Sequence, residues 1–134
     1  MDMIELEFDK KIDPEDLDVE CLRIPETYMK WAERRVEARS AMDEAELRLE
    51  TVKAELQIVI RKSPDEHGID KPTEAAINAA VSTHPRHLKA YEGYIRARKE
   101  AALLNEAVQT MEKKDAMLKL LVTLHGQAYF AGPS

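Results

Sequence analysis

A chain of 134 residues in which 34% are charged and only 5% are aromatic favours long solvated helix faces over a compact enzyme core. The net charge of −6 is unevenly distributed, because residues 1–20 hold nine acidic residues and two lysines while the remainder is close to neutral. Cys21 is the only cysteine, which excludes an intrachain disulfide and favours a reducing cytoplasm.

The acidic amino-terminal region, residues 1–24, is predicted to contain two short elements. Apolar and acidic residues alternate over Ile4–Phe8, and this period of two predicts a short extended strand. The Asp-Pro-Glu-Asp sequence at 13–16 then supplies an N-cap, a proline for the first turn and acidic side chains at the positive end of a helix dipole. It predicts a short helix over about Pro14–Arg23, which Pro25 separates from the next helix.

The first long helix is predicted to run from Pro25 to about Lys62. Apolar residues recur every three or four positions from Met42 to Val59, a spacing typical of a coiled-coil seam. Loop residues follow at 63–68, and a short apolar helix that begins near Pro72 is expected to fill the bend.

The second long helix is predicted to run from Pro85 to a C-cap at Gly126, with an apolar stripe in the same register. Two slender helices cannot bury their stripes alone. We therefore predict an all-α fold in which residues 25–134 form an antiparallel hairpin within a single domain, and the hairpins join into an oligomeric helical assembly.

The last two turns of this second helix are apolar on more than one face. One interpretation is that the amino-terminal short helix covers them. We prefer an oligomerisation contact between subunits, because one slender protomer has few other elements to place there. The residues assigned to this contact are Met117, Leu118, Leu120, Leu121 and Leu124.

The sequence offers no set of residues typical of catalysis, metal binding or a bound cofactor. The four histidines lack cysteine or carboxylate partners for zinc, and the four glycines are too scattered for a phosphate-binding loop. Residues 1–11 do not resemble a signal peptide, and Ala116–Leu124 is too short to span a bilayer, so we expect no membrane association.

Binding of a polyanion is the remaining interpretation, because cations are spread along the predicted helices. A near-neutral subunit repeated in an oligomer would still present a multivalent surface for single-stranded nucleic acid. The alternative is that each cluster is a solvated face offset by neighbouring acids. The residues we expect to contact single-stranded DNA are Arg61 and Lys62 above all, with Lys53, Arg34 and Arg35. A further cationic stretch spans Thr83–Glu100.

Scattered residues in both long helices are similar to those of a known family. The first set is Ile12-Asp13, Leu17, Glu20 and Tyr28-Met29-Lys30-Trp31, and the second is Leu88-Lys89, Ala107-Val108, Met111, Lys114-Asp115 and Leu118-Lys119. In these positions the chain resembles the UvsY family of recombination mediators from T-even-type phages.

The resemblance implies a phage protein that acts in the host cytoplasm as a non-catalytic accessory. It implies a ring of about six to eight subunits that binds single-stranded DNA and helps load a RecA-type recombinase onto DNA covered by single-strand-binding protein. The family's Lys-x-Arg motif aligns here with Ile58 and Ile60, and Arg61 and Lys62 stand just beyond them.

Two other functions are compatible with the sequence. A scaffolding coiled-coil oligomer would use its helices only to build an assembly and would bind no nucleic acid. An adaptor would instead regulate a protein partner through the acidic residues of the amino-terminal arm.

Overall fold

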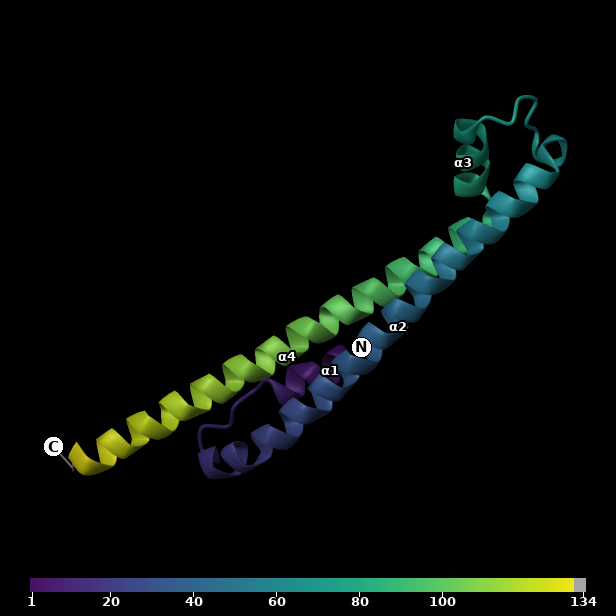
Figure 1. Cartoon of the computed structure of the whole chain (residues 1–134). Coiled ribbons are helices and arrows are strands. Elements are labelled where there is room, and N and C mark those ends of the chain that lie inside the picture. The colour runs from purple at the N-terminus through teal and green to yellow at the C-terminus, as the bar shows by residue number, and fades with distance from the viewer. Residues whose placement is uncertain (132–134) are drawn as a thin grey trace. The chain divides into compact units, whose positions relative to one another are not determined.

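The computed structural model describes residues 1–131, with side chains up to residue 127, and leaves residues 132–134 of the predicted hairpin outside the described residues. The described range is helical and contains no strand (Figure 1). Its elements are α1 (Met3–Asp9), α2 (Leu17–Lys62), the 3₁₀ helix η1 (Pro64–His67), α3 (Glu74–Thr83) and α4 (Pro85–Ala131). The prediction of an all-α chain with two long helices is confirmed for these residues.

The chain divides into two compact units, and α2 and α4 contribute to both. Unit 1 contains Met1–Glu37 with the chain from Glu100 onward, and unit 2 contains Ala38–Lys99.

In unit 1 the two long helices run antiparallel, as their side-chain pairs show. Glu20 pairs with Lys114, and farther along α2 Tyr28 and Arg35 contact Glu112 and Asn105, so the partners run in reverse order. Apolar side chains fill the seam between these polar pairs. The most deeply buried are Trp31, Leu104, Ala107, Val108, Met111 and Leu118, each at most 4% exposed.

Unit 2 has its own apolar core at the junction of α2, α3 and α4. It consists of Val52, Leu56, Ile60, Ile69, Ile77, Val81 and Ala90. The turn that leads into α3 ends η1 at Gly68, whose φ of 72° is a left-handed conformation that favours glycine. Thr73 then caps α3 by accepting a hydrogen bond from the Ala76 amide at 3.1 Å.

The predicted strand at the amino terminus is wrong, because residues 3–9 form the helix α1. Asp2 caps this helix by accepting a hydrogen bond from the Glu5 amide at 3.0 Å. A helix also presents its residues differently from a strand: Leu6 is buried, whereas Ile4 and Phe8 are 84% and 75% exposed. The alternation of apolar and acidic residues was therefore not the signal of a half-buried strand.

Two predicted helix boundaries are also wrong. The predicted short helix does not stop before Pro25, because α2 begins at Leu17 and continues through that proline. Ile24 is buried beside the proline and Glu20 pairs with Lys114 of α4, and these contacts oppose the cost of a proline inside a helix, which is about 3 kcal/mol or more. α4 likewise continues through Gly126 to Ala131 instead of ending at the glycine.

Helix α1 is held against α2 by ion pairs. The Arg34 guanidinium donates hydrogen bonds of 2.7 and 3.1 Å to the two carboxylate oxygens of Glu5, and Lys30 Nζ lies 2.9 Å from Glu5 Oε1. These contacts, from Arg34 first and then Lys30, lower the pKa of Glu5 to about 2 from its ordinary value of 4.5. Asp9 accepts hydrogen bonds from Lys30 and from Trp31 Nε1, the latter at 2.9 Å.

The lowered pKa of Glu5 predicts how the docking of α1 depends on pH. An ionised Glu5 stabilises the docked helix fully above pH 4.5, and this contribution is lost as the pH falls toward 2. We expect the wild type to hold α1 more firmly than Glu5→Gln near neutral pH, and the difference to shrink between pH 4.5 and 2. Thermal melts followed through Trp31 emission measure it, and a difference that is constant across this range would contradict the assignment.

Candidate nucleic-acid interface

Of the five predicted DNA contacts, Arg34 and Arg35 lie in unit 1, where both side chains have partners within the protein. Arg34 holds Glu5 as described above and also lies over the Trp31 ring, 4.7 Å from its centroid. Arg35 donates to Asn105 Oδ1 at 3.4 Å. Both arginines are half-buried, so with α1 docked neither presents a free guanidinium to a DNA strand.

The other three predicted contacts lie in unit 2. Arg61 donates to the Glu74 carboxylate of α3 at 2.7 Å, and this contact raises the pKa of Arg61 and lowers that of Glu74. Lys53 and Lys62 are exposed and form no ion pair with any described residue. Lys62 shares a face of α2 with Arg48, because fourteen residues bring a helix to nearly the same orientation.

The most cationic hollow in unit 2 is a shallow cavity of about 580 Å³ between α2 and α4. The eight described residues that line it include four cations and no carboxylate. We call it the cation groove. Its lining residues are Ala45, Arg48, Val52, Arg86, Lys89, Ala90, Gly93 and Arg96.

The groove owes its space to small residues and its charge to helical spacing. Ala45, Ala90 and Gly93 lack the volume to fill the gap between the helices, and a Cβ built on Gly93 meets no atom within 4 Å. Residues 86, 89, 93 and 96 recur every three or four positions, which places them on one face of α4. The cations of α4 therefore line one wall, while α2 contributes Arg48.

Most of the charge in the cation groove is available to a ligand. Arg48, Lys89 and Arg96 form no hydrogen bond or ion pair within the described part of the chain. Arg86 is paired with Glu55 at 2.7 Å, but both side chains are 53% exposed, and an ion pair so exposed contributes little to stability. A polyanion could replace Glu55 at modest cost.

Sequence reasoning had noted the cationic stretch Thr83–Glu100 but did not select residues from it, and it missed Arg48 altogether. The usable signal was the spacing of Arg86, Lys89 and Arg96 around a glycine on one helix face. Arg48 gave no such signal, because only the pairing of α2 with α4 brings it to the same groove.

The residues assigned to oligomerisation differ in their burial. Leu118 is 1% exposed and belongs to the core of unit 1. Leu121 is partly buried, while Met117, Leu120 and Leu124 are 47%, 51% and 49% exposed. We call these four the carboxyl-terminal apolar patch.

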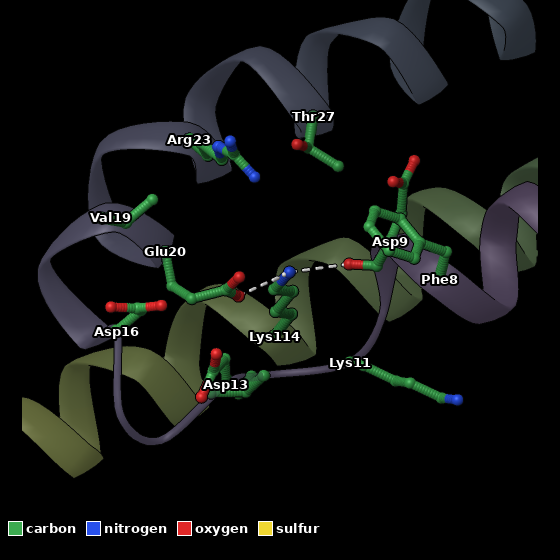
Figure 2. Close-up of a pocket in the computed structure, with 11 residues that line it drawn as sticks. Phe8, Asp9, Lys11, Asp13, Asp16, Val19, Glu20, Arg23, Thr27 and Lys114 are labelled. Atoms are coloured by element: carbon green, nitrogen blue, oxygen red, sulfur yellow. Dashed lines mark hydrogen bonds and ion pairs between the residues drawn. The ribbon is translucent and has the colours of Figure 1, made fainter.

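A second hollow, of about 340 Å³, lies in unit 1 around the connection from α1 to α2. Figure 2 shows Lys114 between the carboxylate of Glu20 and the main-chain carbonyl of Asp9, at 2.9 and 2.7 Å. Acidic side chains line much of the rest, including Asp13 and Asp16. Lys114 therefore ties α1 to α4, and the four carboxylates of the lining outnumber its three cations, so the hollow has no excess of positive charge to attract a polyanion.

The described residues lack two other kinds of functional feature. They contain no group of three or more histidine, cysteine or carboxylate side chains that could hold a metal ion. None of their helices combines the length and the apolar character needed to cross a membrane.

A groove walled by unpaired cations on a helical pair is typical of a protein that holds a nucleic acid by its phosphate backbone. The comparison with protein families agrees with this class. The family model described as "Recombination, repair and ssDNA binding protein UvsY" matches residues 5–90, about two thirds of the chain, and the chain belongs to this family. Searches of curated proteins and of solved structures each give no significant match.

Proposed function

We propose that the chain is a single-stranded-DNA-binding recombination mediator whose strand lies in the cation groove. The observation that carries the proposal is the set of three unpaired cations, Arg48, Lys89 and Arg96, around an open cavity in a member of this family. Phosphates bind such cations with release of counterions. Lys62 and Lys53 extend the cationic surface along α2, and Arg61 joins it where a phosphate displaces Glu74.

The mode of contact fits the role of a mediator. The four cations of the groove recognise phosphates, and the groove is lined by no aromatic side chain for base stacking. A strand held by its backbone keeps its bases free for a recombinase. In this mechanism the protein weakens the hold of single-strand-binding protein on the DNA and assists the loading of a RecA-type recombinase.

Gly93 offers a direct test of the groove. Because a Cβ there meets nothing within 4 Å, Gly93→Ala and Gly93→Glu should both fold, with alanine gaining about 0.5–1 kcal/mol of stability. The introduced carboxylate would neutralise neighbouring cations. We expect Gly93→Glu to weaken binding of an oligo(dT) probe by roughly an order of magnitude at low salt, while Gly93→Ala binds as the wild type does.

The salt dependence of that binding gives the second readout. For single strands the slope of log affinity against log salt is about −0.7 for each phosphate contacted. Replacing Arg48 and Arg96 by glutamine should therefore make the slope shallower by about 1.4. Binding by the wild type that is indifferent to salt, or absent at low salt, would exclude the electrostatic mechanism.

Mediation is tested separately from binding. Wild type should shorten the lag before a RecA-type recombinase hydrolyses ATP on DNA coated with single-strand-binding protein, and Gly93→Glu should not. On uncoated DNA the two proteins should behave alike, because no competitor has to be displaced. A lag that the wild type leaves unchanged would refute recombinase loading while leaving DNA binding intact.

We also propose that the carboxyl-terminal apolar patch joins copies of the chain into a homo-oligomer. Side chains that are about half exposed within the protomer lose this exposure when copies associate. Light scattering should show that Leu120→Asp with Leu124→Asp reduces the particle mass without loss of helix content. Leu118→Asp is the contrasting variant and should unfold unit 1, since Leu118 is already buried there. An unchanged mass in the double variant would refute this interface.

A further inference from the structure

A second cationic cluster lies in unit 1, on the face of α2 that helix α1 covers. Its donors are Lys30, the indole N–H of Trp31, and Arg34, and every one of them is bound by a carboxylate of α1. Arg34 binds Glu5 through two parallel hydrogen bonds, of 2.7 and 3.1 Å. The planar guanidinium fork that fits a carboxylate in this way fits a phosphate equally well.

Helix α1 is attached mainly by these polar contacts. It has seven residues, too few to be a stable helix alone, and Leu6 is its one buried residue. Its apolar residues Ile4 and Phe8 are 84% and 75% exposed. Two tethers add to the ion pairs: the terminal amine of Met1 pairs with Glu100, and Lys114 binds the Asp9 carbonyl. A helix held largely by charge can be displaced by another anion.

We propose that Lys30, Trp31 and Arg34 form a second binding site for single-stranded DNA, and that the carboxylates of α1 occupy it as an internal substitute for phosphates. This inference rests on the proposed function, since it deepens the DNA contact of the same protein. Residues 1–20, with nine acidic residues and two lysines, then act as an autoinhibitory arm. Phosphates of a DNA strand then compete with Glu5 and Asp9 for the covered cations.

The test removes the carboxylates of α1 without changing their shape. In Glu5→Gln with Asp9→Asn the arm no longer holds the cations, and affinity for oligo(dT) at low salt should rise by roughly an order of magnitude. The slope of log affinity against log salt should steepen by about 1.4, for two additional phosphate contacts. Adding Lys30→Gln and Arg34→Gln should abolish both gains.

The chain offers a matched control with the same change of charge. Among the described residues, Glu7 forms an ion pair with Lys10, the C-cap residue of α1, and Glu15 is exposed, so Glu7→Gln with Glu15→Gln leaves the covered site intact. If this control gains as much affinity as the Glu5 and Asp9 variant, the arm acts through net charge alone and the proposal is overturned.

Trp31 provides a second measurement, because it is the only tryptophan and is fully buried. Oligo(dT) should alter its emission in the Glu5 and Asp9 variant more than in the wild type, and an equal response in both would also refute the covered site. Circular dichroism confirms that the Glu5 and Asp9 variant is folded. If that variant does not fold, Glu5→Gln alone replaces it in the same measurements.

The outcomes separate this inference from the proposed function. If the wild type binds oligo(dT) and Gly93→Glu weakens that binding, but neither the Glu5 and Asp9 variant nor Glu5→Gln alone gains affinity, only this inference fails. If no variant binds oligo(dT), the proposed function fails with it.

Discussion

The burial of one apolar stripe on each long helix is the constraint on which the rest of the structure depends. Trp31, Val108 and Met111 have no exposed surface in unit 1, and Ile60 has none in unit 2. Removing a side chain of this size from a core costs about 2–5 kcal/mol, several times the value of an exposed ion pair. The apolar stripes therefore fix the register of α2 against α4 within each unit, and the charged residues take the positions that the register leaves them.

The cation groove follows from that register and from residue volume. Large side chains such as Leu56 and Ile60 fill the seam in the core of unit 2, whereas Ala45 and Gly93 leave it open in the groove. The register also decides which cations find partners. Glu55 reaches Arg86, but no described carboxylate pairs with the other three cations of the groove. The groove and its unpaired positive charge therefore arise where the residues of the apolar stripe are small.

Hydrophobic periodicity predicted the two long helices. It could not show which of several competing local signals decides whether a short segment is a helix or a strand, or where a helix ends. The residues of α1 alternate in polarity as a strand would, and the Asp2 cap, which decides for a helix, is a single side chain. Pro25 alone predicts a helix boundary, yet α2 continues through it beside the buried Ile24 and the Glu20–Lys114 pair. The candidate nucleic-acid interface was harder to predict than the helices. Nothing in the sequence shows that Arg34 has a partner and Arg48 has none, and only the fold shows that Glu5 of α1 binds the first while the second lines the groove.

The different surroundings of these two arginines explain how a chain of net charge −6 can still present positive charge to a polyanion. Nine of its acidic residues lie in residues 1–20, where Glu5 and Asp9 pair with cations of unit 1, whereas no carboxylate lines the groove of unit 2. Four cations in one protomer give only a modest, salt-sensitive hold on a strand. In the proposed assembly, copies joined at their apolar patches would hold the same strand at several points, and the affinities would combine because each contact raises the effective concentration for the next. Under the proposed function, assembly and DNA binding would therefore be coupled through valency.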